Sequence, residues 1–228
     1  MKGAWRGVLF DLDGTLIDSA PDLAGAGNEM RIARGLEPLA YEAFRPMVGS
    51  GARGMVGIAL GVGPTDDGYD ALRTEFLDRY AVRMTSATCV FADIPPLLAQ
   101  LRAAGLPWGI VTNKAMRFAE PLVAALGFGD HGVAALVCGD TTPHAKPHPA
   151  PLLEGARRLG IEPGACVYIG DDLRDVQAGR AAGMATVIAA WGYLGVGDPI
   201  ETWGADHVIG APLDLLDLPS IGSRAPNP

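Results

Sequence analysis

The sequence of 228 residues has few cysteines, few lysines and no long apolar run. Its three cysteines, Cys89, Cys138 and Cys166, lack C-x-x-C spacing, which excludes a zinc motif and a disulfide framework and predicts reduced, buried thiols. No run of about 18 apolar residues occurs, and the first residues contain no apolar segment of a signal peptide. We therefore expect a cytoplasmic protein that contacts no membrane.

The charge is acidic, with a formal net value of −8. Binding to nucleic-acid backbones requires a basic surface, so this balance argues against a nucleic-acid partner. An anionic small molecule would need local positive charge, although the chain has only three lysines. The hydrophobic content of 49% is enough to bury a sizeable core. Composition leaves monomer and homodimer both open.

Short apolar runs alternate with helical stretches, which is typical of an α/β fold with a doubly wound parallel sheet. The expected strands are residues 8–10, 109–111, 135–138, 166–169, 186–189 and 207–209. Helical stretches at 97–105 and 151–160 end in glycine, as helix C-caps do. The final nine residues are rich in Pro and polar groups and are expected to form a loose tail.

The first two expected strands are separated by about a hundred residues, whereas a βαβ unit needs about 30. Helical stretches occur in this interval at 21–35 and 69–81, and residues 18–86 contain no convincing strand. We therefore predict a Rossmann-like core of residues 1–17 and 88–228, with an inserted helical cap of residues 18–87.

Polar side chains follow three of the expected strands. They are Asp11 and Asp13 after the first strand, Thr112 and Asn113 after the second, and Asp171, Asp172 and Asp175 after the fourth. Ligands of parallel sheets bind beyond the carboxyl ends of the strands, so we expect these residues to meet in one crevice. Lys146 lies in a proline-stiffened stretch and is the lysine expected to neutralise the carboxylates.

Four segments resemble, in order, the motifs of the haloacid dehalogenase superfamily. They are F-D-L-D-G-T-L (10–16), I-V-T-N-K (110–114), A-K-P-H-P (145–149) and I-G-D-D-L-R-D (169–175). The insertion after the first motif resembles the subfamily of phosphoglycolate phosphatases and β-phosphoglucomutases. This resemblance implies an Mg²⁺-dependent phosphatase that hydrolyses a small phosphomonoester through an aspartyl-phosphate.

The resemblance also implies roles for single residues. Asp11 would be the nucleophile and Asp13 the general acid and base. Thr112 and Lys146 would hold the phosphoryl group, and Asn113 would bind substrate. Asp11, the backbone carbonyl of Asp13 and Asp171 would hold Mg²⁺, with Asp172 and Asp175 in supporting positions. Which acidic residue of the fourth motif touches the ion directly remains open at this point.

Phosphoryl chemistry explains why two carboxylates stand so close together. A phosphomonoester is a dianion, so a carboxylate approaches it only when a metal ion and a lysine cancel the repulsion. Magnesium prefers about six oxygen ligands, of which carboxylates supply some. Asp11 and Asp13 can then act as a pair on one phosphorus atom.

The glycine-rich stretch 49–53 resembles the specificity loop of the cap, which predicts that Ser50 and Arg53 contact the substrate, with Arg45 as an alternative. Segments 47–56, 71–80, 113–121 and 203–206 resemble the N-acetylmuramic acid 6-phosphate phosphatases of peptidoglycan recycling. 2-Phosphoglycolate and N-acetylmuramic acid 6-phosphate therefore both stay open as substrates. Each carries a carboxylate that an arginine can bind.

Two alternatives remain beside the phosphatase. A phosphomutase shares all four motifs and differs mainly in its cap. A non-catalytic protein that binds a phosphometabolite is the second, although it would have no use for an intact Asp11 and Asp13. His144 and His148 have the spacing of metal ligands, but they flank Lys146 in a proline-rich stretch and are expected at the surface.

Overall fold

The computed structural model describes residues 5–219, so the tail predicted at 220–228 lies outside the described residues. A six-stranded sheet has the order β5-β4-β1-β6-β7-β8, and all neighbouring strands are parallel. The strands are β1 (Gly7–Phe10), β4 (Trp108–Val111), β5 (Ala135–Val137), β6 (Cys166–Gly170), β7 (Ala185–Ala189) and β8 (His207–Ile209). Every apolar run predicted as a strand is confirmed, with ends shifted by at most one residue.

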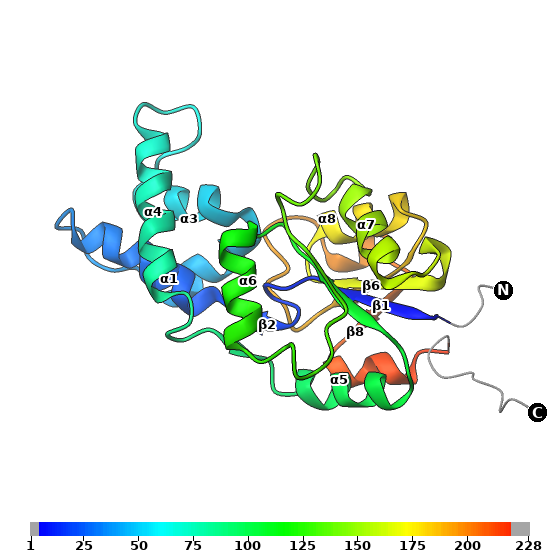
Figure 1. Cartoon of the computed structure of the whole chain (residues 1–228). Coiled ribbons are helices and arrows are strands. Elements are labelled where there is room, and N and C mark those ends of the chain that lie inside the picture. The colour runs from blue at the N-terminus through cyan, green and yellow to red at the C-terminus, as the bar shows by residue number, and fades with distance from the viewer. Residues whose placement is uncertain (1–4, 220–228) are drawn as a thin grey trace, which may run out of the picture.

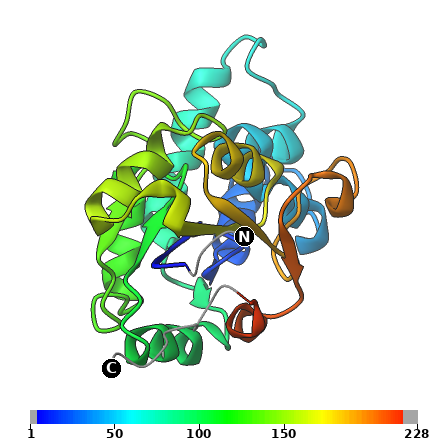
Figure 2. The same cartoon turned by 90° about the vertical axis from the view of Figure 1, so that its right-hand side faces the viewer.

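Helices cover both faces of the sheet (Figure 1 and Figure 2). The helices α5 (Ile94–Ala103) and α6 (Met116–Ala125) share an apolar core with Val8 and Phe10 of β1. On the other face, α7 (Ala150–Leu159) and α8 (Leu173–Ala181) pack around Leu9. Successive residues of β1 thus point to opposite faces, and each face is covered, as a doubly wound fold requires.

The central position of β1 decides which strand ends meet. Val8 pairs with Trp108 of β4, and Leu9 pairs with Tyr168 of β6. The carboxyl ends of β1, β4 and β6 therefore lie side by side. The remaining short elements are the 3-10 helices η2 (Pro163–Ala165), η3 (Ile200–Thr202) and η4 (Pro212–Asp217).

A group of helices lies between the two-residue strands β2 (Ile17–Asp18) and β3 (Cys89–Val90), which pair antiparallel. This helical segment contains α1 (Ala20–Ile32), α2 (Tyr41–Phe44), η1 (Arg45–Ser50), α3 (Gly51–Leu60) and α4 (Tyr69–Arg83). Figure 1 shows it as a separate lobe beside the sheet. The sequence did not predict β2 and β3, because two residues are too short to display a strand period.

The helical segment has an apolar core of its own, which includes Phe44, Met55 and Phe76. Phe118 of α6 and Tyr193, both from the sheet domain, also belong to this cluster. Side chains of the sheet domain therefore contribute to the packing of the helical segment.

All three cysteines are free, and Cys138 and Cys166 are buried. Cys89 is exposed on β3, so the prediction of a buried thiol is wrong there, because this two-residue strand belongs to the short two-stranded sheet and not to the covered sheet. Within residues 5–219, no helix has both the length and the apolar character needed to cross a bilayer.

Candidate active site

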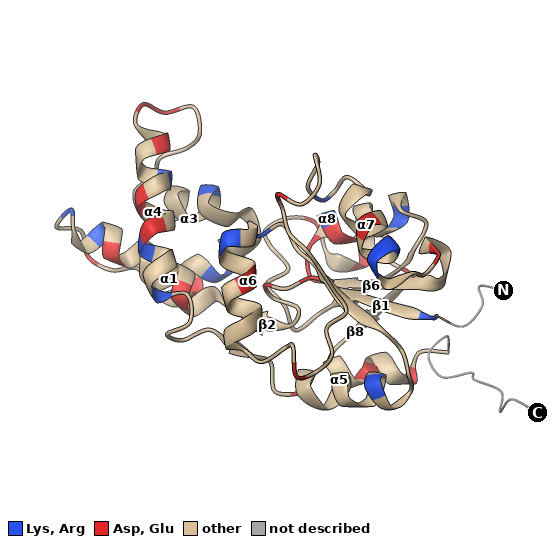
Figure 3. Ribbon diagram, viewed as in Figure 1, with Lys and Arg blue, Asp and Glu red and all other residues tan. Residues whose placement is uncertain are grey.

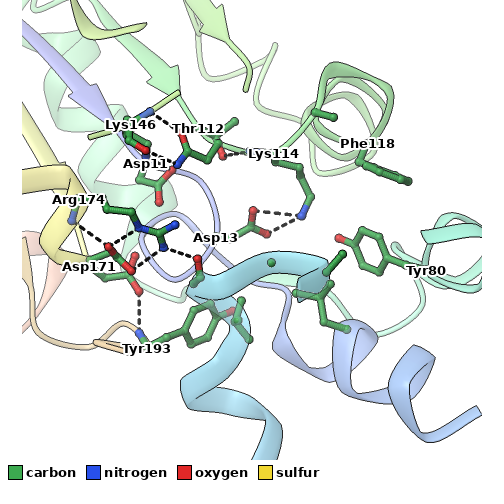
Figure 4. A pocket seen from close by; sticks show the side chains of 18 of the residues that line it. Asp11, Asp13, Tyr80, Thr112, Lys114, Phe118, Lys146, Asp171, Arg174 and Tyr193 are labelled. Carbon is green, nitrogen blue, oxygen red and sulfur yellow. Dashed lines mark hydrogen bonds and ion pairs between the residues drawn. The ribbon is translucent and has the colours of Figure 1, made fainter. Parts of the chain in front are cut away.

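A cavity of about 260 Å³ lies at the carboxyl ends of β1, β4 and β6, next to the helical segment (Figure 4). Its lining includes all the residues that the sequence places after these strands, together with Lys146. They are Asp11, Asp13, Thr112, Asn113, Lys146, Asp171, Asp172 and Asp175. Residues separated by up to 164 positions are thus brought to one site by the order of the strands.

Three carboxylates form a cluster at the bottom of the site. Oxygen atoms of Asp11, Asp171 and Asp175 all lie within 4.8 Å of one another. The Lys146 ammonium lies 2.8 Å from Oδ1 of Asp11 and 2.8 Å from Oδ1 of Asp175. One ammonium balances one of the three carboxylates, so the ionised cluster keeps an excess of negative charge.

The pKa values of these groups reflect this excess of negative charge. Burial raises the pKa of the Asp11 carboxyl to about 7, Lys146 opposes the shift, and the charge of Asp175 adds to it. Burial also raises the pKa of Asp171 well above its ordinary value, and the charges of Asp11 and Asp175 act in the same direction. Burial alone would lower the pKa of Lys146, but its two carboxylate partners reverse the effect and keep the lysine charged.

This donor set fits a divalent cation. Magnesium takes hard oxygen ligands, and a bound ion would supply the positive charge that the cluster lacks. Asp11, Asp171 and Asp175 are the residues placed to hold it. The carboxylate of Asp13 lies outside this cluster, so a contribution from its backbone carbonyl stays a prediction.

Asp172 caps a helix and is not part of the carboxylate cluster. Its carboxylate accepts a hydrogen bond from the Arg174 backbone at 2.9 Å and caps the start of α8. It also forms an ion pair with the Arg174 side chain at 2.8 Å. Of the acidic residues in the fourth motif, Asp171 and Asp175 therefore face the cluster, and Asp172 does not belong to it.

Gly14 allows the loop after β1 to approach the cluster. Its φ of +85° lies in the left-handed region, and a Cβ atom there would lie 2.2 Å from an Asp171 oxygen. A side chain at this position would displace Asp171. The glycine of the first motif is thus required by both conformation and space.

Asp13 is held apart from the acidic cluster. Lys114 Nζ donates to its two carboxylate oxygens at 2.9 and 3.1 Å, and Ser19 Oγ donates to one of them. Figure 4 shows Asp13 and Lys114 pointing toward each other, with Tyr80 beside the lysine. Burial would lower the pKa of Lys114, but Asp13 and Tyr80 reverse this shift, so the lysine stays charged.

Lys114 was not singled out from the sequence, which pointed to Lys146 as the neutralising lysine. The feature of the sequence that could have pointed to Lys114 is its position in the second motif, I-V-T-N-K, two residues after Thr112. The Lys114 backbone donates to Oγ1 of the buried Thr112 at 3.1 Å, a turn that starts the chain toward α6. The site therefore has one lysine for each of the two aspartates of the first motif.

Asn113, predicted to bind substrate, uses both ends of its amide on the Lys146 backbone. It donates to the Lys146 carbonyl at 3.0 Å and accepts from the Lys146 amide at 2.9 Å. Tyr168 supports the same lysine: its hydroxyl accepts from Lys146 Nζ at 2.8 Å and donates to the Val111 carbonyl at 2.7 Å. Two residues that are distant in sequence thus fix where Lys146 points.

The structure does not bring Ser50 or Arg53 to the cavity lining. Arg53 is exposed on α3, whereas the preceding Ala52 lines the cavity, because successive helical residues are rotated by about 100°. Arg45 donates to the Trp191 and Gly192 carbonyls at 3.2 and 2.9 Å. The arginines that line the cavity are instead Arg73, Arg117 and Arg174.

His144 and His148 are exposed, as predicted, with ring centres 4.3 Å apart. Neither belongs to the acidic cluster or to the lining of the cavity. The spacing that resembles a pair of metal ligands therefore has no counterpart at the site.

Residues 5–183, which include all four motifs and the cavity's aspartates, match the family of haloacid dehalogenase-like hydrolases. The chain belongs to the haloacid dehalogenase-like hydrolase family. The predicted resemblance to this family is thereby confirmed. The four motifs of this hydrolase converge on one cavity, although β1 and β4 are separated by the whole helical segment.

Among its relatives, this haloacid dehalogenase-like hydrolase is 43% identical to an N-acetylmuramic acid 6-phosphate phosphatase of Pseudomonas aeruginosa, over 93% of this chain and 94% of the relative. It is also 43% identical to a phosphoglycolate phosphatase of Xylella fastidiosa, over 95% and 93% of the two chains. A crystal structure of a predicted phosphoglycolate phosphatase from Haemophilus somnus is similar at 26% identity and a TM-score of 0.82, over 93% of this chain and 97% of that one.

Proposed function

We propose that this hydrolase is an Mg²⁺-dependent phosphatase for a small phosphomonoester that also carries a carboxylate. The observation that carries the proposal is the pair of Asp11, buried beside Lys146, Asp171 and Asp175, and Asp13, held by Lys114. This arrangement suits a nucleophile and a separate proton carrier. The phosphatases among the relatives support the same reaction.

In the proposed reaction, a carboxylate oxygen of Asp11 attacks phosphorus in line as the bond to the leaving oxygen breaks. Lys146 and the Thr112 hydroxyl hold the phosphoryl oxygens. Asp13 donates a proton to the leaving alkoxide, and later takes one from the water that hydrolyses the aspartyl-phosphate. Bound magnesium supplies positive charge that favours the ionised carboxylates and offsets the charge of the phosphoryl group.

We propose that the helical segment, residues 18–87, acts as a cap over this site. Val48, Gly49 and Ala52 line the cavity from η1 and α3, and Tyr80 lines it from α4. The Arg174 side chain donates to the Gly49 carbonyl and joins the segment to the sheet domain. A cap in this position excludes water from the reacting phosphate and contacts the leaving group.

The two substrates expected from the sequence carry over into this proposal. 2-Phosphoglycolate and N-acetylmuramic acid 6-phosphate both combine a phosphate with a carboxylate, and relatives are named for each. Hydrolysis of the second would place the enzyme in peptidoglycan recycling in the cytoplasm. The acidic and basic residues are interspersed on the ribbon in Figure 3, which suits a small-molecule substrate better than nucleic acid.

The test is turnover of p-nitrophenyl phosphate, 2-phosphoglycolate and N-acetylmuramic acid 6-phosphate by the purified protein with Mg²⁺. We expect catalytic turnover with all three and a higher kcat/KM for one carboxylated substrate. Binding of these compounds without turnover would favour the phosphometabolite-binding alternative. Formation of an isomeric phosphate instead of inorganic phosphate would favour the phosphomutase.

A further inference from the structure

One face of α4 lines the cavity beyond the acidic cluster. Arg73, Phe76, Leu77 and Tyr80 all belong to the lining, at the i, i+3, i+4 and i+7 spacing of one helical face. Phe76 and Tyr80 are buried, whereas Arg73 is exposed at the other end of this row. The row thus changes from aromatic to cationic along the helix.

The row has a defined direction relative to the catalytic residues. Tyr80 is its inner end, because Lys114 Nζ lies 4.9 Å from the centre of the Tyr80 ring and also contacts Asp13. Arg73 precedes Tyr80 by seven residues, which corresponds to about 10 Å along a helix axis. Arg73 therefore lies about two helical turns beyond Tyr80 along α4.

A second arginine that lines the cavity belongs to α6. The ring of Phe118 lies 5.5 Å from that of Tyr80, so the two helices contact each other through these rings. The Arg117 guanidinium lies 4.5 Å from the centre of the Phe118 ring, and Arg117 lines the cavity. On both α4 and α6, an arginine thus lies on the same helix as the aromatic residues that line the cavity.

Within residues 5–219, neither Arg73 nor Arg117 has a hydrogen bond or an ion pair with another side chain. Two other arginines of the helical segment do have acidic partners: Arg34 binds Glu75 at 2.6 Å, and Arg83 binds Glu29. Two arginines without acidic partners thus line the same cavity, where their guanidinium groups are available to an anionic ligand.

We propose that Arg73 and Arg117 bind a second anionic group of the substrate, a carboxylate, while Phe76, Tyr80 and Phe118 contact its carbon skeleton. The inference rests on the proposed phosphatase function and narrows its substrate class. In 2-phosphoglycolate a single CH₂ group separates the carboxylate from the phosphate ester oxygen, so its two anions lie close together. In a pyranose with its phosphate on C6 and a carboxylate-bearing lactyl ether on C3, six atoms (C6, C5, C4, C3, O3 and the lactyl Cα) separate the carboxylate from the phosphate ester oxygen, so the two anions can reach groups much farther apart.

A matched pair of substrates tests the proposal. N-Acetylmuramic acid 6-phosphate and N-acetylglucosamine 6-phosphate differ only by the lactyl ether that carries the carboxylate. We expect Arg73→Gln and Arg117→Gln each to lower kcat/KM for the first substrate about tenfold, the size of a charge-assisted contact at an exposed site. The second substrate should change by less than about threefold, because it lacks the group that these arginines bind.

Two further variants serve as comparison. Arg102→Gln removes an exposed arginine of α5 that lies outside the cavity and should change neither substrate. Arg53→Gln tests the residue that the sequence predicts. A selective loss in Arg53→Gln, with none in Arg73→Gln or Arg117→Gln, would overturn the proposal, and so would equal losses on both sugar phosphates.

The proposal and the proposed function can fail separately. If the wild-type protein does not hydrolyse p-nitrophenyl phosphate with Mg²⁺, the phosphatase assignment is wrong. In that case, calorimetry can still measure the affinity of the Asp11→Asn protein for N-acetylmuramic acid 6-phosphate, with and without Arg73→Gln. The difference between the two affinities reports the contribution of Arg73 to binding. Unchanged affinity in this pair, or a tenfold preference of the wild-type enzyme for 2-phosphoglycolate, would contradict the second anion site.

Discussion

The ammonium group of Lys114 lies 2.9 Å from one carboxylate oxygen of Asp13 and 3.1 Å from the other. Asp11, two residues earlier, is paired with Lys146 instead, at 2.8 Å. Each aspartate of the first motif thus has its own lysine, one from the second motif and one from the third. The separation keeps the proposed nucleophile and the proposed proton carrier in different electrostatic surroundings.

Lys114→Met should lower kcat about tenfold to a hundredfold, because Asp13 loses the cation that fixes its orientation. Lys114→Arg keeps the charge and should retain more activity than the methionine variant. Steady-state kinetics with a sugar phosphate measure both. Full activity of Lys114→Met would show that Ser19 alone suffices to hold Asp13.

Asp11→Asn should reduce phosphatase turnover to background, because the amide keeps the shape but cannot attack phosphorus. Asp13→Asn should lower kcat by about 10² to 10⁴, the range of general acid and base catalysis. Circular dichroism should show both variants folded. Retention of several per cent of wild-type kcat in Asp11→Asn would contradict the covalent route.

Removal of the metal should stop the reaction. EDTA should abolish turnover and Mg²⁺ should restore it, because the carboxylate cluster repels a phosphate dianion without a cation. Ca²⁺ should inhibit, since its longer bonds and higher coordination number shift Asp11 from in-line geometry. Equal rates with Ca²⁺ and Mg²⁺ would exclude a strict dependence on metal geometry.

Stability should depend on pH through Asp11. Its pKa rises from the ordinary 3.8 to about 7, so in this window the folded metal-free protein binds more protons than the unfolded chain. Raising the pH through the window therefore lowers the free energy of unfolding of the metal-free protein. Because Mg²⁺ competes with the proton, the gain in Tm on adding Mg²⁺ should grow from about pH 5 to about pH 8. A gain independent of pH would contradict the raised pKa, and Asp11→Asn should reduce the pH dependence.

Lys146→Met should destabilise the metal-free protein by about 3 to 5 kcal/mol, because two buried carboxylates lose their cation. Urea unfolding in EDTA measures this change. The double variant Lys146→Met, Asp175→Asn should recover part of the loss, since it removes one of the unpaired charges. Equal stabilities of the wild-type and single-variant proteins would show that the cluster is already protonated.

The strands and the order of the site residues could be predicted because both follow from patterns of neighbouring residues in the sequence. A short apolar run indicates a strand buried on both faces of a sheet, whatever the rest of the chain contains. Asp11, Thr112 and Asp171 directly follow such strands. Residues after neighbouring parallel strands share one edge, so their convergence followed from the pattern. The insertion was predicted from an interval that is too long for one crossover.

Contacts between distant segments could not be predicted in the same way. The sequence contains Asp172 and Asp175 with equal chemistry, but only the start of α8 turns Asp172 toward Arg174 and Asp175 toward Lys146. Likewise, the sequence contains Lys114 and Lys146, but it does not indicate which aspartate forms an ion pair with each lysine. These pairings depend on the register of β1 between β4 and β6 and on the path of each following loop.

The sequence by itself determined the fold class, the family and the strand ends at which the acidic residues meet, because hydrophobic period and motif order are local properties of the chain. Only the tertiary structure decided which arginine reaches the cavity. Arg53 and Arg73 both lie on amphipathic helices of the helical segment, and the rotation of each helix about its axis sets which side chains face inward. That rotation is fixed by packing around Phe44, Met55 and Phe76, which places Arg73 on the cavity lining and leaves Arg53 outside it.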